Sequence, residues 1–312
     1  MTFSLLRFIF ACLLLPCLWT GRAEAVSLPE LGSAVPGHGD VTYLDLARMV
    51  IPDLAADKDG FFRGSMPIEM RHIAGPDYDG SPPATSGLSN AGVLGIKAGG
   101  KERLTMLFDL GDSPDSAEGY AVLALYDITG KPALLDAVNV AVDRITYLRD
   151  PGKLPIGPGD DAIISMSTHF NSSQGYGITP LIMVRSERFE LIDMIYTFDE
   201  NLCTNRRTQN AAFQAIADGQ PYAAIKVTVT DATVPGEESC DGQRRQRRLR
   251  ATFPSPIIGT KTLRTTSRIP TRWTDWQKRT PNASEPTAFV CPARSAGLEF
   301  ASHSALEGSI HG

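Results

Sequence analysis

The chain has 312 residues, with 30 Lys and Arg against 35 Asp and Glu, and 42% of its residues are hydrophobic. This apolar fraction excludes an intrinsically disordered chain, and no repeat of collagen or coiled-coil type is present. The length suits one large domain or two small ones, and no apolar run after residue 25 is long enough for a membrane-spanning helix.

Residues 1–25 have the pattern of a secretory signal peptide. Arg7 carries a positive charge, residues 8–19 are mostly apolar, and residues 23–25 (Ala-Glu-Ala) match the small-x-small site of a signal peptidase. An uncleaved anchor would need a longer apolar run. We therefore expect the mature chain to begin at Val26 and the protein to be periplasmic or secreted, with no transmembrane segment after cleavage.

The first predicted element of the mature chain is a helix over residues 41–54. Apolar residues spaced three and four apart, from Leu44 to Ile51, form one stripe, and Pro52 marks its end. The next stretch is rich in Gly, Pro, Asp and Ser and is predicted to be mostly loop. It holds one short predicted strand, over residues 68–73.

Strand signals then follow in quick succession, each an apolar or alternating run bounded by turn residues. Only one further short helix is predicted, over residues 208–217. Many short strands with tight turns favour an antiparallel meander that closes into a sandwich or barrel. The predicted fold class is therefore mainly β with a minor α part, one N-terminal helix and a disordered C-terminal tail. The predicted strands cover residues 91–97, 103–109, 120–126, 134–144, 162–170, 178–185, 189–198 and 222–230.

Two of the predicted hairpins resemble each other. Residues 122–138 and 182–195 each contain an apolar strand, a turn and the pattern Leu-(Leu/Ile)-Asp-x-(Val/Ile), which places Asp136 and Asp193 at matching positions. The likeness suggests a weak internal duplication or two blades of a propeller. Antiparallel hairpins can also converge on such a pattern without shared descent.

Charge divides the mature chain near residue 240. Residues 26–240 contain 16 basic and 29 acidic side chains, a net charge of −13, and are predicted to form the globular β domain. Residues 241–312 contain 12 basic and 5 acidic side chains, a net charge of +7. This second segment lacks persistent periodicity and has the composition of a basic, low-order tail.

The basic tail has two further interpretations. Residues 243–250 (QRRQRRLR) would suit phosphate contacts, but no nucleic-acid-binding fold accompanies them, so no nucleic-acid partner is expected. Contact with an anionic membrane surface suits this charge better. Residues 271–278 can be written in codons whose neighbouring frame encodes an amphipathic helix. The tail is therefore also a candidate out-of-frame translation, which reading the coding DNA in all frames would test.

Three cysteines remain after signal cleavage, in an exported chain that meets an oxidising compartment. The preferred disulfide joins Cys203 and Cys240 and leaves Cys291 over. The alternative is that Cys291 pairs with one of the other two.

The segment with the greatest density of chemical groups is residues 165–176 (SMSTHFNSSQGY), where a strand runs into a turn. A His beside amide and hydroxyl groups can act as a general base, and a hydrolase would combine His169 with an acid from elsewhere in the fold, Asp109 or Asp161. The structural alternative is a polar loop whose side chains satisfy the backbone. The candidate binding residues are His169, Asn171, Ser172, Gln174 and Tyr176.

Two Asp-x-Asp-Gly sequences suggest oxygen ligands for Ca²⁺. Neither has the further acidic positions of an EF-hand loop, and Asp and Gly also build ordinary turns. Zinc and phosphate-loop patterns are absent, so no other cofactor is expected. The candidate calcium ligands are Asp57, Asp59, Asp77 and Asp79.

These observations favour an exported, non-catalytic binding or interaction module with a small-molecule or protein partner. No paired catalytic signature is present, so the sequence leans away from an enzyme. The alternatives are a secreted hydrolase that uses His169 and a calcium-stabilised structural protein. A cavity around His169 would favour the hydrolase, and a His169 ring bonded into the fold without one would favour the module.

Overall fold

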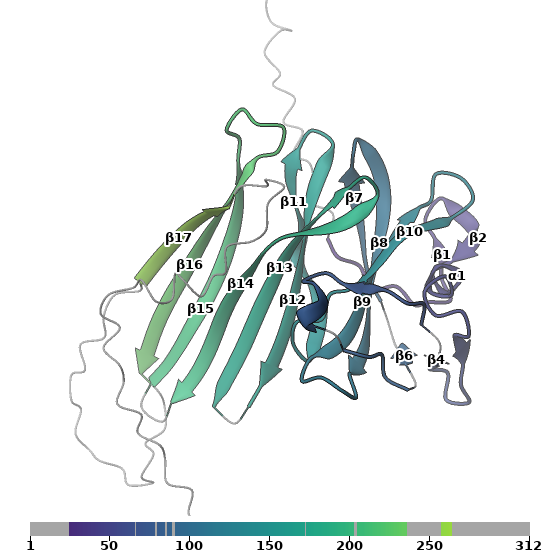
Figure 1. The fold of residues 1–312 in the computed structure, drawn as a ribbon, viewed down its shortest axis with the longest axis horizontal. Coiled ribbons are helices and arrows are strands. Elements are labelled where there is room, and N and C mark those ends of the chain that lie inside the picture. Colours follow the sequence, from purple (N-terminus) through teal and green to yellow (C-terminus); the bar gives the residue numbers. More distant parts are fainter. Residues whose placement is uncertain are drawn as a thin grey trace, which may run out of the picture.

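The computed structural model describes residues 25–65, 67–78, 80–84, 86–88, 91–171, 173–202, 205–235 and 257–263. The predicted fold class is confirmed: the protein is mainly β, largely antiparallel, with very little helix (Figure 1). Several predicted features lie outside the described residues, namely the signal peptide up to residue 24, Asp79, Ser172, the cysteines Cys203, Cys240 and Cys291, and most of the basic tail.

The N-terminal part contributes short strands and a five-residue helix, α1 (Tyr43–Ala47). Thr42 caps this helix, because its hydroxyl accepts a hydrogen bond from the Asp45 N–H while the Asp45 carboxylate accepts one from the Thr42 N–H. No helix of the described part has the length and apolar character needed to cross a membrane. The other elements are β1 (Ala34–Val35), β2 (His38–Thr42), β3 (Ala55–Ala56), β4 (Phe62–Gly64), β5 (Arg71–His72), the 3-10 helix η1 (Pro76–Tyr78) and β6 (Ser86–Leu88).

Helix α1 is shorter than the helix predicted over residues 41–54. After Ala47 the chain continues in turns, and Pro52 disfavours a helical conformation for Ile51 before it. The predicted apolar stripe is nevertheless mostly buried: Val50 and Ile51 are inaccessible to solvent, and Leu44 is partly buried against the same cluster. The periodicity therefore predicted the buried face correctly and the length of the helix wrongly.

A five-stranded sheet follows, with the strand order β5-β10-β9-β8-β7. Its long strands pair antiparallel, and the two-residue β5 pairs parallel with β10. Strands β8 and β9 bury most of their side chains on both faces, which explains their nearly continuous apolar sequences. The long strands are β7 (Gly92–Ala98), β8 (Lys101–Asp112), β9 (Gly119–Asp127) and β10 (Ala133–Asn139).

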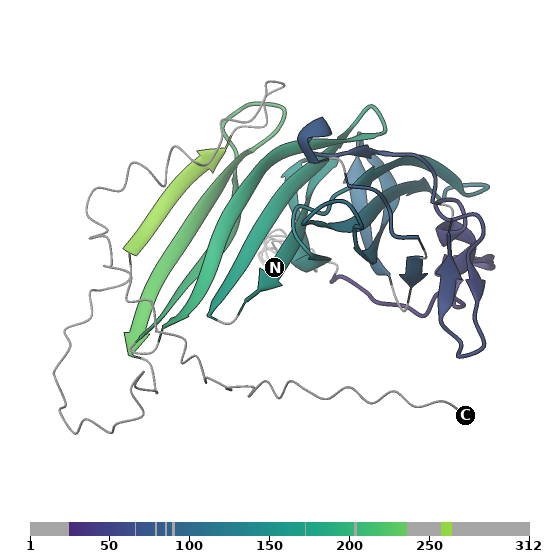
Figure 2. The same cartoon turned by 60° about the horizontal axis from the view of Figure 1, so that its bottom comes forward.

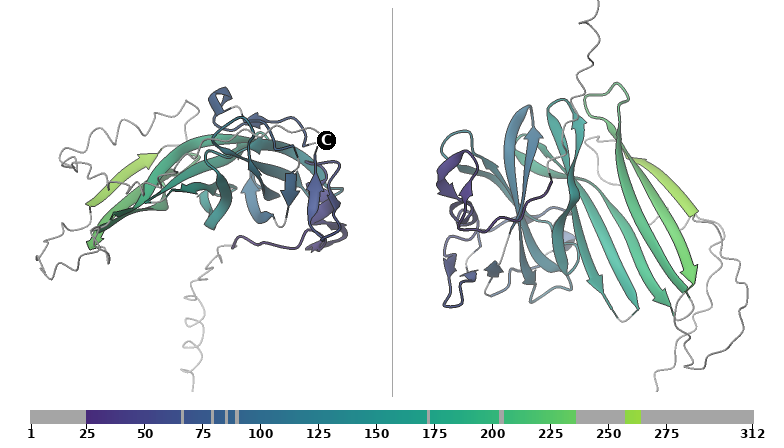
Figure 3. Two further views of the ribbon diagram at one scale, coloured as in Figure 1. Left: turned by 90° about the horizontal axis from the view of Figure 1, so that it is seen from below. Right: turned by 180° about the vertical axis from the view of Figure 1, so that it is seen from behind.

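The second half of the chain forms a seven-stranded antiparallel meander in which each strand pairs with the next. We call it the curled sheet, because it bends across its width into an arch (Figures 2 and 3). Its strands are β11 (Ile145–Gly157), β12 (Asp160–Phe170), β13 (Gln174–Arg185), β14 (Arg188–Leu202), β15 (Asn205–Ile216), β16 (Ala224–Pro235) and β17 (Ile257–Leu263).

Strand β15 occupies the segment predicted as a helix over residues 208–217, and that prediction is wrong. Its alanines favour a helix in isolation, but all twelve residues of β15 pair with β16. Ala211 lies opposite Val229 and joins the buried cluster that this face of the sheet forms. Tertiary packing has therefore overridden local propensity.

The basic tail contributes one strand. Residues 257–263 form β17, which pairs with β16 along seven residues and becomes the edge of the curled sheet. The sequence predicts no strand here, because the segment is too short for its alternation to be distinguished from the irregular tail around it. The remaining tail residues, 241–256 and 264–312, lie outside the described residues.

Three buried clusters hold the layers together. The first packs the N-terminal part against one face of the five-stranded sheet, where the Tyr126 hydroxyl donates to the Leu46 carbonyl at 3.0 Å. The second joins the other face of that sheet, through Leu123, to Ile163 of the curled sheet. The third lies on the opposite face of the curled sheet and includes Ile164, the neighbour of Ile163 on β12. The five-stranded sheet is thus the middle layer.

The two hairpins that resemble each other in sequence share a β-bulge. In β9–β10 the extra residue is Leu135, and in β13–β14 it is Ile192. Each bulged residue stands directly before the matching aspartate, Asp136 or Asp193. The hairpins belong to two packed sheets, so they are not blades arranged around one axis.

Candidate functional site

Two hollows in the surface gather most of the exposed apolar side chains; we name them the sheet groove and the edge cleft. The described chain exposes eight large hydrophobic residues, of which Phe61 and Ile216 lie outside both hollows. The six that line one hollow or the other are Leu28, Ile145, Tyr147, Phe170, Tyr176 and Val234.

The sheet groove has a volume of about 520 Å³ and is lined by six consecutive strands, β11 to β16. These strands belong to one sheet, and β11 also hydrogen-bonds to β15 across it, so the groove lies within the curl. Alternate residues of a strand share a face, so Met166 and Phe170 of β12 continue the face on which Ile164 is buried. The groove is therefore the open end of the apolar interior. Its lining residues are Tyr147, Met166, Thr168, Phe170, Gly175, Tyr176, Gly177, Thr197, Phe198, Asp199, Arg206, Thr208, Gln209, Asn210 and Val234.

Two glycines of β13 make room for large side chains in the sheet groove. A Cβ at Gly175 would lie 2.5 Å from Cε1 of Phe170, its cross-strand partner. A Cβ at Gly177 would lie 2.6 Å from Cε of Met166. The phenyl ring therefore lies over a bare backbone, and at 70% exposure it presents most of its surface to solvent.

The charged groups beside the sheet groove neutralise one another. Arg206 Nε donates to Asp199 Oδ1 at 3.0 Å, and this hydrogen bond holds the pKa of Asp199 below its ordinary value. Arg207 Nε donates to Asp231 Oδ1 at 3.0 Å, and its guanidinium lies 4.8 Å from the ring centre of Phe198. The surface of the groove that remains for a ligand is consequently mostly apolar.

The edge cleft, about 820 Å³ in volume, lies where β11, the edge strand of the curled sheet, meets β7 and β8. The segment before β1 forms one wall, because Ser27 and Val93 exchange backbone hydrogen bonds of 3.0 and 2.8 Å. The lining residues are Val26, Leu28, Gly87, Gly92, Leu107, Asp109, Leu110, Gly111, Asp112, Arg144, Ile145, Thr146, Tyr147, Leu148 and Asp150.

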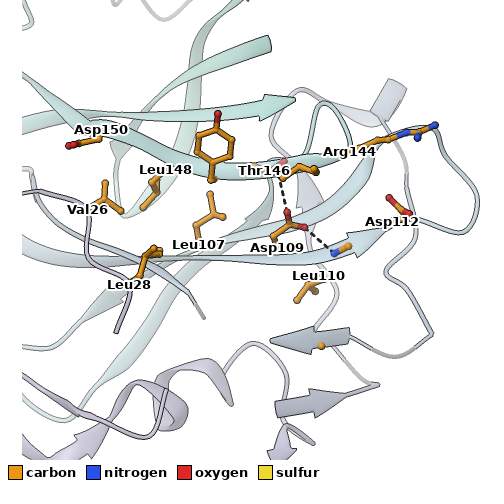
Figure 4. A pocket seen from close by; sticks show the side chains of 15 residues that line it. Val26, Leu28, Leu107, Asp109, Leu110, Asp112, Arg144, Thr146, Leu148 and Asp150 are labelled. Carbon is orange, nitrogen blue, oxygen red and sulfur yellow. Dashed lines mark hydrogen bonds between the residues drawn. The ribbon is translucent and has the colours of Figure 1, made fainter. Parts of the chain in front are cut away.

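The edge cleft has an apolar middle and acidic ends. In Figure 4, Leu107 and Leu148 lie between Asp150 on one side and Asp109 with Asp112 on the other. Arg144 is the only cationic side chain among the lining residues, so three carboxylates face one guanidinium. No ion pair within the described residues neutralises these carboxylates, in contrast to the sheet groove.

Asp109 is the most buried of the three carboxylates. It accepts hydrogen bonds of 3.0 Å from the Thr146 N–H and the Gly111 N–H. Burial raises the pKa of Asp109 above its ordinary value of 3.8; the two hydrogen bonds oppose this rise and the negative charge of Asp112 adds to it.

The segment predicted as a binding site forms the β12–β13 hairpin, and its polar side chains hydrogen-bond to other groups of the protein. Gln174 Oε1 accepts from the Tyr176 hydroxyl at 2.7 Å, and Gln174 Nε2 donates to Glu200 at 3.2 Å. Asn171 Oδ1 accepts from the backbone N–H groups of Ser173 and Gln174 and so closes the turn. Of these predicted residues, Tyr176 alone borders the sheet groove, although its ring stacks on His169 on the other face of the sheet.

His169 lies on the opposite face of β12 from the groove side chains Thr168 and Phe170. Its Nδ1 lies 2.6 Å from a carboxylate oxygen of Asp143, and its ring stacks on Tyr176 with centroids 4.8 Å apart. It lines neither hollow. The ring is thus bonded into the fold, which is the arrangement expected of a structural histidine.

The proposed acid partners of His169 do not contact it. Asp109 faces the edge cleft, and Asp161 accepts from the Lys97 N–H at 2.9 Å, near the opposite end of β12. Asp143 occupies the position next to the imidazole instead. It falls within the strand predicted over residues 134–144, which in the structure ends at Asn139, and nothing in the spacing connected it with His169.

Asp57, the first of the candidate calcium ligands, forms hydrogen bonds within its own loop. Asp57 accepts from the N–H groups of Asp59 and Phe61, and Arg63 Nε donates to it at 2.8 Å. Asp77 lies in η1, while Asp79 lies outside the described residues. In the part of the chain that the structure describes, no three His, Cys, Asp or Glu side chains gather as metal ligands would.

Comparisons of the chain with protein-family models, curated proteins and solved structures found no match.

Proposed function

We propose that the protein is an exported, non-catalytic binding module whose ligand presents an extended apolar group to the sheet groove. The observation that supports this most directly is the exposure of Phe170 over Gly175 inside the curl. Tyr147 and Val234 extend this exposed apolar surface. Exposed apolar patches with polar surroundings are typical of ligand or partner sites.

The geometry supports binding more than catalysis at this site. The groove offers aromatic and aliphatic surface and paired charges, while the imidazole of His169 lies on the other face of β12. A reaction would need a nucleophile or base within hydrogen-bond reach of the bound group. The groove's two charged side chains, Asp199 and Arg206, already bond to each other.

A neutral apolar dye tests the proposal. The fluorescence of N-phenyl-1-naphthylamine rises when the dye leaves water, so its titration into the protein measures binding. We expect saturable binding that Phe170→Ser weakens about tenfold, because the phenyl contact contributes on the order of 1.5 kcal/mol. Phe61→Ser is the matched control, since Phe61 is also exposed (51%) but lies outside both hollows.

A second variant tests the shape of the groove without removing an aromatic side chain. Gly175→Ala places a methyl group where the Phe170 ring lies, so the ring must move and dye binding should weaken. Gly130→Ala is its control, because a Cβ at Gly130 meets nothing within 4 Å. Absence of saturable binding by the wild type, or equal effects of Phe170→Ser and Phe61→Ser, would refute the proposal.

A further inference from the structure

We infer that the ligand is a cationic amphiphile, with its apolar chain in the sheet groove and its positively charged head in the edge cleft. This inference rests on the proposed function and adds the chemical class of the ligand. It depends on two observations that the dye experiment does not use: the junction between the two hollows, and the different balance of charge in each.

The two hollows meet at strand β11. Tyr147 lines both, and it is paired across the sheet with Met166 of the sheet groove. Ile145, two residues earlier and on the same face, lines the edge cleft and pairs with Thr168 of the groove. Both side chains are exposed, so an apolar path runs over this edge strand. A chain of methylene groups can follow it without leaving apolar contact.

The balance of charge determines which end of the ligand each hollow takes. In the sheet groove, Asp199 is neutralised by Arg206, so a charged head there would lose water and find no unpaired opposite charge. In the edge cleft, the three carboxylates of Asp109, Asp112 and Asp150 outnumber two cationic groups, the Arg144 guanidinium and the α-ammonium group that cleavage before Val26 leaves at the cleft wall. The repulsion between Asp109 and Asp112 would be relieved by a cation placed beside them.

The nature of the edge cleft also favours an amphiphile over a simple inorganic cation. Leu107 and Leu148 lie between its acidic ends, and Val26 and Leu28 form an apolar wall. A hydrated metal ion gains nothing from these side chains, whereas an alkylammonium head buries its own carbon atoms against them. Apolar lining with a few placed carboxylates is the arrangement that selects such a head.

A ligand series with one chain and three heads tests the inference. Decyltrimethylammonium, decanoate and decyl maltoside, each below its critical micelle concentration, are titrated calorimetrically into the protein at pH 7.5. We expect the cation to bind at least tenfold more tightly than decanoate, with the neutral maltoside between them. Phe170→Ser should weaken all three by a similar factor, because it removes the contact with the shared chain.

The double variant Asp112→Asn/Asp150→Asn should abolish the preference for the cation and leave the affinity for decyl maltoside unchanged, which also shows that the fold is intact. The control Asp40→Asn/Asp59→Asn changes the net charge equally with exposed residues outside both hollows, and the preference should persist. Equal affinity for all three heads, or a preference that survives the first double variant, would overturn the inference alone. Binding of none of the three would count against the proposed function itself.

Discussion

The Asp143 carboxylate accepts a hydrogen bond from Nδ1 of His169 at 2.6 Å. A carboxylate has no proton to donate, so the imidazole must carry its proton on Nδ1. Asp143 also accepts from the Arg144 N–H at 2.8 Å, and its side chain is only 10% exposed. The pair ties the end of β12 to the segment between β10 and β11, while Tyr176 holds the other side of the ring.

This relationship leads us to expect a structural role for His169. His169→Ala removes a partner from a nearly buried carboxylate and one ring of a stacked pair, so the free energy of unfolding should fall by about 1–3 kcal/mol. Urea unfolding monitored by circular dichroism measures the change. His38→Ala is the comparison, since no described hydrogen bond involves its ring, and it should change stability little. A His169→Ala protein as stable as the wild type would return the imidazole to consideration as a catalytic base.

The interface between the five-stranded sheet and the curled sheet gives a prediction about core packing. Ile182 is inaccessible and belongs to the cluster that joins the curled sheet to the five-stranded sheet. Ile182→Ala should reduce the free energy of unfolding by about 2–5 kcal/mol, through lost burial and a residual cavity. Leu135, which is only partly buried against the same cluster, should lose less when truncated. Ile216→Ala removes the same atoms from a side chain 37% exposed and should stay within about 0.5 kcal/mol of wild type. Equal losses at Ile182 and Ile216 would contradict the packing of the two sheets.

The strands with regular apolar signals were predictable, and the irregular ones were not. The predicted apolar runs match four strands, β8, β9, β12 and β13. In these strands, burial of one or both faces produces a regular pattern of apolar residues in the sequence. Strand β11 was missed, since Pro151, Gly152 and Pro155 read as turn residues. In the structure they fall where the pairing of β11 with β12 shifts register, so the strand continues past them.

The same irregular strand explains why the sheet groove is not evident from the sequence. The density of polar groups at 165–176 draws attention to the β12–β13 hairpin, and Tyr176 of that hairpin borders the groove. The groove itself depends on Gly175 and Gly177, whose sequence pattern is typical of a turn. It also depends on Tyr147, which belongs to β11, a strand that the sequence did not predict. The alternation of outward Ile145 and Tyr147 with buried Thr146 and Leu148 was the signal that could have located it. Asp143 and His169 are 26 residues apart, and only the fold brings them together.

The partly buried Asp109 carboxylate of the edge cleft makes stability depend on pH in a way that can be checked. The pKa of Asp109 is raised in the folded protein, chiefly by burial, so its protonated form is favoured there. Its contribution to stability is therefore fully present below the ordinary value of 3.8 and is lost as the pH rises through the raised pKa. Asn at this position has no such titration. The unfolding free energy of the wild type minus that of Asp109→Asn should consequently fall as the pH is raised from about 3.8 towards neutrality. Urea unfolding at a series of pH values measures this difference, and any loss of the hydrogen bonds from Thr146 and Gly111 adds only a constant offset.

Asp112→Asn, introduced into both proteins, should make the slope shallower, because it removes the neighbouring negative charge. A difference that stays constant across this range would mean that Asp109 is hydrated in the folded protein and that the edge cleft is open to water at its acidic end.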